Sequence, residues 1–300
     1  MRKFRVYQVD AFTNQKFKGN PAGVVSNADG LSDAEMLSIA RELNNSETAF
    51  VLSPTGLDHD VWVRFFTPTI EIPSCGHATI SAHYVRATER KLRSCTVLHK
   101  IGIGILPVEI VQQDDDYRII MTQGKIEFSH PFVGTERKDI IGALRLSESD
   151  LDERCPIQIV STGHSKVLVG SRSRQTLNAF RPNLQQLADI SRVIGCNGYF
   201  VFTFDSDSPG ILTCGRMFAP AIGISEDPVT GNANGPLGAY IVRHNLVEIS
   251  NASLMFNALQ GEAIGRPGIV EVHVDVQDTV PTRVRVGGRA VIAFETEIAI

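Results

Sequence analysis

Residues 218–242 read Phe-Ala-Pro-Ala-Ile-Gly-Ile-Ser-Glu-Asp-Pro-Val-Thr-Gly-Asn-Ala-Asn-Gly-Pro-Leu-Gly-Ala-Tyr-Ile-Val, and this segment has the most informative pattern in the sequence. Its pattern predicts an apolar strand over 218–224, a turn at 226–228, and a helix of small residues that begins at Gly231 and ends near Val242. The first turn of such a helix leaves backbone N–H groups without intrahelical partners, so the corner favours an anionic group of a ligand. The acidic pair Glu226-Asp227 beside it adds candidate proton carriers.

The composition is that of an ordinary globular protein. The chain has 300 residues, of which 43% are hydrophobic and 21% charged, enough for two domains of typical size. The net charge is −4 without a long run of either sign, which argues against nucleic acid and membrane surfaces as partners. The sequence shows neither a secretory signal nor an apolar run of membrane-spanning length, so we expect a cytoplasmic protein. The five cysteines are scattered without a Cys-x-x-Cys spacing, which indicates free thiols.

The second half of the chain repeats the first at an offset of about 150 residues, which predicts an internal duplication. A capped helix, an apolar strand, a Phe-x-Pro segment and a Gly-x-Ala corner recur in the same order. The matching segments are Leu31-Ser32 with its helix and 184–194, 49–52 and 199–202, 66–68 and 218–220, and 76–78 and 231–233. We therefore predict two similar domains at 1–127 and 128–283, followed by a segment, 284–300, that can return to the first domain. Within the C-terminal region, Gly287-Gly288 predicts a tight turn between two strands.

The duplication suggests where a functional site lies. Two copies related by a pseudo-two-fold axis would place the corners at Gly76 and Gly231 opposite one another in a cleft between the domains. Two opposed helix N-termini would stabilise a small carboxylate and the negative charge that develops at its adjacent carbon. Glu47, His77 and Asp227 are the candidate acids and bases.

Each of these residues also has an ordinary structural explanation. Glu47 alone fits a solvated loop carboxylate, and His77 alone fits a helix cap. Asp227 precedes a proline and fits a turn. Cys75 is more often a buried small residue than a nucleophile, although a helix N-terminus is a place where thiols become reactive. His77 and His83 point to different sides of a helix, which argues against a metal site.

Several motifs, taken together, resemble one known family, the PhzF family of phenazine-biosynthesis-like isomerases. The resemblance covers nearly all 300 residues, and its motifs follow one another in the family's order. They are Val9-Asp10-Ala11-Phe12, Gly19-Asn20-Pro21-Ala22-Gly23-Val24, Ser46-Glu47-Thr48-Ala49-Phe50, Cys75-Gly76-His77-Ala78-Thr79 and Glu226-Asp227-Pro228-Val229-Thr230-Gly231.

The resemblance implies a diaminopimelate-epimerase-like α/β fold with two pseudo-symmetric domains, each a bent mixed sheet wrapped around a central helix. It implies an isomerase that needs no cofactor or metal, acts on a small molecule and forms a homodimer. Glu47 would be the general acid/base, and His77 and Asp227 would bind the substrate and tune proton transfer. The implied substrate-binding residues are Gly76, Gly231, Asn232, Asn20 and Cys75.

One residue departs from the family pattern. Family members that act on dihydro-hydroxyanthranilate resemble Glu-Asp-Pro-Ala-Thr-Gly-Ser, whereas this chain has Asn232 at the place of that serine. An amide does not exchange a proton as a hydroxyl does. The departure separates this chain from the phenazine substrate and leaves proton-shift chemistry open.

The leading hypothesis is therefore a proton shift on a small carboxylate-bearing substrate, catalysed by Glu47. One alternative is an amino-acid epimerase, racemase or dehydratase that uses Cys75 as a base. Two-base epimerases of the wider fold have a second cysteine near the position of Thr230, which weakens this alternative. A second alternative is a non-catalytic protein that binds small acids. The presence of Glu47 in only one copy, opposite Gly198 in the other, argues against it.

Overall fold

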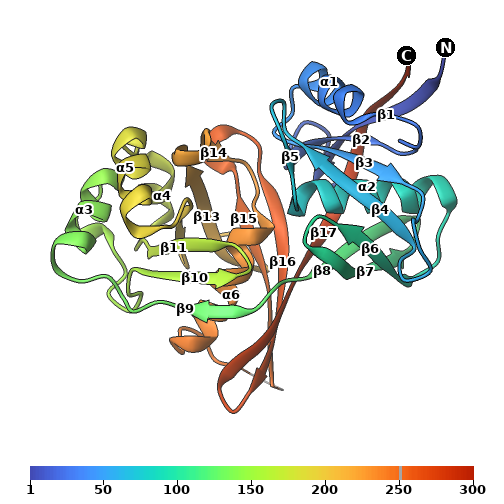
Figure 1. Ribbon diagram of the computed structural model, residues 1–300. Helices are drawn as coiled ribbons and strands as arrows, with labels where there is room; N and C mark the ends of the chain where they lie inside the picture. The colour runs from blue at the N-terminus through green and yellow to red at the C-terminus, as the bar shows by residue number, and fades with distance from the viewer. Residues whose placement is uncertain (250–251) are drawn as a thin grey trace. The chain divides into compact units, whose positions relative to one another are not determined.

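The computed structural model describes residues 1–249 and 252–300 and divides into two compact units (Figure 1). Unit 1 comprises residues 1–122 and 287–300, and unit 2 comprises residues 123–286. The sequence predicted divisions at 127/128 and 283/284. The structure divides the chain where strand β8 (Asp116–Thr122) ends and within the long strand β17 (Val280–Ala299). Among the described residues, no helix is both long enough and apolar enough to cross a membrane.

Unit 1 is a mixed sheet with two helices. The strands before β8 are β1 (Lys3–Ala11), β2 (Asn20–Val25), β3 (Thr48–Leu52), β4 (Val61–Phe66), β5 (Glu71–Ile72), β6 (Cys95–Ile101) and β7 (Gly104–Gln113), and the helices are α1 (Asp33–Leu43) and α2 (Gly76–Arg90). β17 pairs antiparallel with β1, and β1 pairs antiparallel with β2. From there the pairs alternate: β2–β3 parallel, β3–β4 antiparallel, β4–β6 parallel and β6–β7 antiparallel.

Helix α2 is the central helix of unit 1. It contacts strands β1, β2, β3, β4, β7 and β8, and nine of its fifteen residues are buried. Small side chains such as Ala78, Ser81 and Ala82 let the strands approach it from several sides. The surrounding sheet therefore fixes the position of the N-terminus of α2.

Helix α1 forms as the sequence predicts. The Ser32 hydroxyl accepts a hydrogen bond from the Glu35 N–H at 3.3 Å, and the Glu35 carboxylate accepts one from the Ser32 N–H at 2.7 Å. Asn44 ends the helix in the left-handed conformation. The predicted capping box is confirmed.

Unit 2 is built on the same plan around helix α6 (Gly231–Arg243), of which eleven of thirteen residues are buried. Its strands are β9 (Ile126–Phe128), β10 (Gln158–Thr162), β11 (Ser165–Gly170), β12 (Tyr199–Thr203), β13 (Ile211–Ala219), β14 (Ile224–Asp227), β15 (Ser253–Gln260), β16 (Gly268–Gln277) and the first part of β17. Its other helices are α3 (Gly134–Leu144), α4 (Arg174–Ala179) and α5 (Leu184–Ile194), with short 3-10 turns η1 (Glu148–Asp150), η2 (Pro220–Ile222) and η3 (Glu262–Ile264).

The strand pairings of unit 2 follow the order seen in unit 1. The pairs are β11–β12 parallel, β12–β13 antiparallel, β13–β15 parallel and β15–β16 antiparallel. Tyr199 lies opposite Phe218 in the second pair, as Thr48 lies opposite Phe66 in unit 1. The repeated order agrees with the repeat in the sequence, while the duplication itself stays a prediction.

Two local predictions were wrong. The run 218–224 is not one strand, because β13 ends at Ala219, the turn η2 follows, and Gly223 adopts a positive φ of 85° before β14. Pro220 has no N–H to continue a ladder. Gly287-Gly288 is not a turn either, because β17 runs through both residues. A Cβ at Gly287 would lie 2.8 Å from the Ile119 carbonyl oxygen, so this glycine permits close approach of β8.

Candidate active site

Glu47, Cys75 and His77 form a cluster in unit 1, which we call the Glu47 cluster. His77 Nε2 lies 3.3 Å from Glu47 Oε2, and His77 Nδ1 lies 3.5 Å from Cys75 Sγ. The Ser46 hydroxyl is 3.4 Å from the same Nε2. The imidazole therefore lies between a carboxylate and a thiol, and the sequence-predicted residues of unit 1 meet.

The local fold explains why these side chains converge. Glu47 directly precedes β3, and its carbonyl oxygen accepts a hydrogen bond from the Gly23 N–H at 3.2 Å. Cys75 is the N-cap of α2, so Gly76 and His77 are its first two residues. Their N–H groups belong to the first helical turn, which has no intrahelical acceptors. A strand start and a helix start thus place acid, base and backbone donors together.

The Glu47 cluster is suited to proton transfer. The side chains of His77 and Glu47 are only 9% and 13% exposed, so water screens their interaction weakly. A neutral imidazole donates from one ring nitrogen and accepts at the other. His77 can therefore orient the Glu47 carboxylate and exchange a proton with it while its other nitrogen faces the Cys75 thiol.

The three side chains also offer a carboxylate oxygen, a thiol sulfur and an imidazole nitrogen within 4.8 Å of one another. Three such ligands are the number that a catalytic zinc site uses. However, Glu47 and Cys75 contact opposite nitrogens of the His77 ring. Each ring nitrogen thus has its own partner, an arrangement that suits proton transfer.

Asn20, the remaining predicted residue of unit 1, begins β2 opposite Ala11 and is 1% exposed. It follows Gly19, whose φ of 63° turns the chain into the strand. A Cβ at Gly19 would lie 2.1 Å from the Ala11 carbonyl oxygen, so the turn needs glycine there. Asn20 therefore has a clear structural position in the β1–β2 pair, and its role in substrate binding stays a prediction.

In unit 2, Asp227 ends β14 and is held by a network that the sequence did not reveal. The Thr230 hydroxyl donates to Asp227 Oδ2. The Gln260 amide nitrogen donates to the Asp227 carbonyl oxygen at 2.9 Å and to Thr230 Oγ1 at 3.1 Å, while its oxygen accepts from the Thr230 N–H at 3.0 Å. Gln260 is 1% exposed, and its hydrogen bonds hold the loop that leads into α6.

Gly231 and Asn232 form the first turn of α6 and contact Gln123. The Gln123 amide nitrogen donates to Asn232 Oδ1 at 3.1 Å and to the Gly231 carbonyl oxygen at 3.2 Å, while Thr162 donates to Gln123 Oε1 at 2.6 Å. The carbonyl end of the Asn232 amide is thus engaged, which leaves its NH2 end as the donor. Asn232 can therefore hold an acceptor atom, but it cannot relay a proton as a serine hydroxyl can.

Gly198 occupies the position that matches Glu47, and Lys166 fills the space beside it. A Cβ at Gly198 would lie 2.3 Å from Lys166 Cδ. Lys166 is 9% exposed, and its ammonium group donates to the Ser165 carbonyl oxygen at 3.0 Å. Burial lowers the pKa of Lys166, and the nearby Cys196 and Asp227 oppose that shift. Unit 2 thus places a buried lysine where unit 1 has its acid.

Glu226 is part of a structural ion pair, which corrects its sequence-based interpretation as a proton carrier. Its carboxylate accepts two hydrogen bonds from the Arg216 guanidinium at 2.9 and 2.8 Å. The side chains are 13% and 3% exposed. A carboxylate held in this way on both oxygens anchors β14 against β13 rather than exchanging protons.

The comparisons with known proteins agree on one family. The family model described as phenazine biosynthesis-like protein, PhzC-PhzF, matches residues 9–296. An uncharacterized isomerase of Clostridium acetobutylicum is 57% identical over 300 residues, covering 100% of this chain and 99% of that protein. The uncharacterized isomerase YddE of Escherichia coli K12 is 50% identical over 299 residues, with 99% of each chain covered.

A more distant relative has a named reaction. The trans-2,3-dihydro-3-hydroxyanthranilate isomerase of Pseudomonas chlororaphis is 31% identical over 290 residues, covering 94% of this chain and 95% of that protein.

Solved structures support the predicted fold class. The PhzF-family protein of Bacillus anthracis aligns with a TM-score of 0.89 at 31% identity, and each chain is covered completely. A hydroxyproline epimerase of Agrobacterium vitis aligns with a TM-score of 0.65 at 12% identity, covering 100% of this chain and 93% of that one, which shows a shared fold alone. The predicted epimerase-like α/β fold is confirmed, and the chain belongs to the PhzC-PhzF family of phenazine biosynthesis-like proteins and is an isomerase of that family.

Proposed function

We propose that this isomerase shifts a proton on a small carboxylate-bearing substrate, with Glu47 as the general acid/base. The observation that carries the proposal is the contact between His77 Nε2 and Glu47 Oε2 at 3.3 Å, next to the N-terminus of α2. It supplies a poised carboxylate, an orienting imidazole and backbone donors for an anion in one place.

In the proposed reaction, the Glu47 carboxylate removes a proton from a carbon of the substrate. The negative charge that develops on the substrate is stabilised by the first-turn N–H groups of α2, to which Gly76 contributes. His77 keeps Glu47 oriented and shares its proton. The proton then returns to a different carbon, and the reaction consumes neither an oxidant nor a cofactor. From the family resemblance we also propose that Asp227 takes part.

Asn232 supports the substrate class that we propose. The related Pseudomonas enzyme is named for trans-2,3-dihydro-3-hydroxyanthranilate. In this chain the Asn232 carbonyl oxygen is engaged by Gln123, and only the NH2 end is left to donate. We propose a substrate whose acceptor group, such as a carboxylate oxygen, binds there. We further propose that the protein is a homodimer, which light scattering on the purified protein would test.

The decisive experiment measures proton exchange rather than product formation. Small aromatic and amino acids are screened by thermal shift, and each compound that binds is incubated with the protein in D2O and followed by NMR. We expect wild type to incorporate deuterium at carbon and Glu47→Gln to bind with little change. Exchange should fall by about 10²-fold or more in the variant, because positioned acid–base catalysis contributes 10²–10⁴-fold.

Glu42→Gln is the matched control, because Glu42 is an exposed glutamate of α1. It should exchange at the wild-type rate. Wild-type exchange by Glu47→Gln would overturn the assignment. A wild-type protein that binds these compounds without exchanging any carbon-bound proton would instead favour the non-catalytic small-acid-binding alternative.

The contact between Cys75 Sγ and His77 Nδ1 at 3.5 Å favours a second candidate, an epimerase, racemase or dehydratase that uses Cys75 as a base. The Thr230 hydroxyl donates to Asp227, so this position holds no second thiol. Cys75→Ala separates the candidates. The proton-shift proposal expects exchange to persist, whereas loss of exchange at an amino-acid α-carbon, with inactivation by iodoacetamide at Cys75, would support the epimerase.

A further inference from the structure

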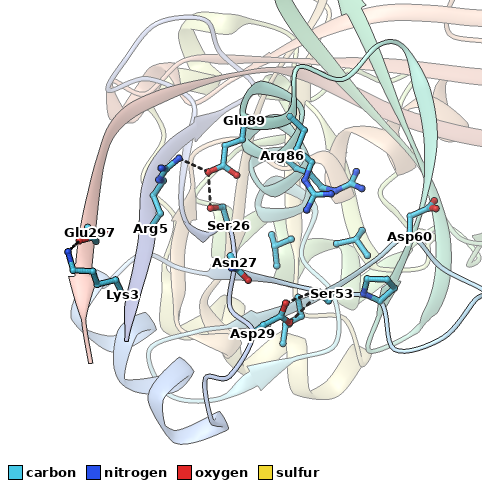
Figure 2. Close-up of a pocket in the computed structure, with 15 residues that line it drawn as sticks. Lys3, Arg5, Ser26, Asn27, Asp29, Ser53, Asp60, Arg86, Glu89 and Glu297 are labelled. Atoms are coloured by element: carbon cyan, nitrogen blue, oxygen red, sulfur yellow. Dashed lines mark hydrogen bonds and ion pairs between the residues drawn. The ribbon is translucent and has the colours of Figure 1, made fainter. Parts of the chain in front are cut away.

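Unit 1 contains a cavity of about 500 Å³ that none of the residues of the Glu47 cluster lines. Its wall includes the C-terminal half of α2, with Arg86 and Arg90, and its apolar lining includes Val51 and Val61. Figure 2 shows Arg86 between Glu89 on one side and Asp60 on the other. The volume of the cavity is within the range of small-molecule sites.

The Arg86 guanidinium has hydrogen-bond donors that the described residues do not satisfy. Its Nε and Nη1 atoms are buried and have no hydrogen-bond partner among residues 1–249 and 252–300. Burial and the neighbouring Arg90 lower the pKa of the Arg86 guanidinium, and Asp60 opposes that shift. A half-buried cation without an acceptor is costly, so such groups normally bind a counter-charge.

Three acids that line the cavity are engaged by other donors. Glu89 accepts hydrogen bonds from Tyr7 at 2.6 Å, from Ser26 at 3.0 Å and from Arg5 at 3.2 Å. The Asp29 carboxylate is held by the N–H and hydroxyl of Ser53.

The third of these engaged acids, Glu297, forms an ion pair with Lys3 at 2.7 Å. The fourth acid, Asp60, uses Oδ2 to accept the Leu98 N–H at 2.7 Å. No ion pair joins Arg86 or Arg90 to any residue in the described part of the chain. The lining thus has four cations and four acids, but none of these acids accepts a hydrogen bond from Arg86 or Arg90.

We propose that this cavity binds a small metabolite through an oxyanion, a carboxylate or a phosphate, which supplies the hydrogen-bond acceptor that the Arg86 guanidinium lacks. Arg90, one helical turn further along α2, is the second cation, and Ser26 and Asn27 are polar groups of the cavity wall. Val51 and Val61 give part of the wall an apolar surface, which suits the carbon body of such a molecule. Arg86 follows His77 by nine residues on the same helix, about 13 Å along its axis at 1.5 Å per residue, so this site is separate from the Glu47 cluster.

The test uses inorganic phosphate and malonate as probes, each compared with sodium chloride at equal ionic strength. We expect either probe to raise the Tm of wild type and to bind in calorimetry. In Arg86→Met the affinity should fall by about tenfold or more, because hydrogen bonds to charged groups are among the strong ones. The ligand-free variant should melt no lower than wild type, since buried nitrogens without hydrogen-bond partners have been removed.

Arg192→Met is the matched control, because Arg192 is an exposed arginine of α5 paired with Asp189. It should keep the response to the probes. A response to phosphate alone would identify a phosphorylated metabolite, and a response to malonate alone a carboxylate. Equal binding of the probes by wild type and Arg86→Met would place them elsewhere, the Glu47 cluster included, and would overturn the proposal. So would the absence of binding by wild type at tens of millimolar.

A second measurement needs no variant. Phenylglyoxal modifies accessible arginines, and peptide mass spectrometry reports each site. We expect phosphate or malonate to slow modification of Arg86 and Arg90 and to leave Arg192 unchanged. Unchanged modification of Arg86 at saturating probe would overturn the proposal even if Arg86→Met did not fold.

Discussion

Substitution of Glu226 by glutamine tests the ion pair with Arg216, which supports the strand that carries Asp227. The Arg216 side chain is 3% exposed and also donates to the Leu177 and Phe180 carbonyl oxygens, each at 2.9 Å. Its guanidinium lies 4.5 Å from the centre of the Phe180 ring. Glu226→Gln leaves this buried cation without its counter-charge. We expect the variant to lose about 3–5 kcal/mol of unfolding free energy, as for other broken buried pairs.

Urea unfolding followed by circular dichroism measures this loss, and a double-mutant cycle isolates the pair. Arg216→Met combined with Glu226→Leu removes both charges and should be more stable than Glu226→Gln alone, because no unmatched charge remains. Glu127→Gln is the control: Glu127 pairs with Lys125 on the surface, and its loss should leave the stability nearly unchanged. A cost below about 1 kcal/mol for Glu226→Gln, or a double variant that is no more stable than Glu226→Gln, would show that the ion pair does not support this strand.

Two further predictions concern unit 1. His83 Nε2 and His99 Nδ1 lie 3.3 Å apart, and burial lowers the pKa of both residues, that of His99 to about 4. The unfolded chain binds the His99 proton near pH 6.5 and the folded chain only near pH 4, so the unfolding free energy should fall as the pH is lowered from 6.5 towards 4. The slope should be about 1.4 kcal/mol per pH unit for each proton that the unfolded chain binds and the folded chain does not. His99→Phe should flatten this fall in urea titrations at pH 7, 6 and 5, and equal slopes for both proteins would contradict the explanation. Gly287→Ala should lower unfolding free energy by about 1–3 kcal/mol in the same assay, because its Cβ would lie 2.8 Å from a backbone oxygen of β8. Gly142→Ala, which has open space around it in α3, should be neutral or stabilising, and equal effects of the two changes would argue against the close approach.

The sequence predicted those features whose causes are local. Helix α1 was predictable because Ser32, Glu35 and Asn44 cap it within its own residues. The Glu47 cluster was predictable in composition because the strand start and the helix start each carry a recognisable motif. Periodicity and capping depend on neighbours in the chain, and these are visible without a structure.

The contacts that the sequence did not predict join residues far apart in the chain. Gln260, at the end of β15, holds Thr230 at the start of α6, and Lys166 fills the space beside Gly198. Neither residue belongs to a motif, and a buried glutamine or lysine looks like a surface residue until its partner is known. Gly287 was misinterpreted for a related reason: a glycine serves a turn or a close approach equally well, and only the neighbouring strand decides between them.

The course of strand β17 has a consequence for the order in which the protein folds during synthesis. β1 pairs with β17 from Lys3 opposite Ala299 to Ala11 opposite Ala290 (Figure 1). β1 is therefore synthesised long before β17, its partner strand. All of unit 2 leaves the ribosome before the closing segment of unit 1. Until then one edge of β1 lacks its partner, and an unpaired strand edge invites association with other chains. The unit that carries the Glu47 cluster begins first on the ribosome and is completed last.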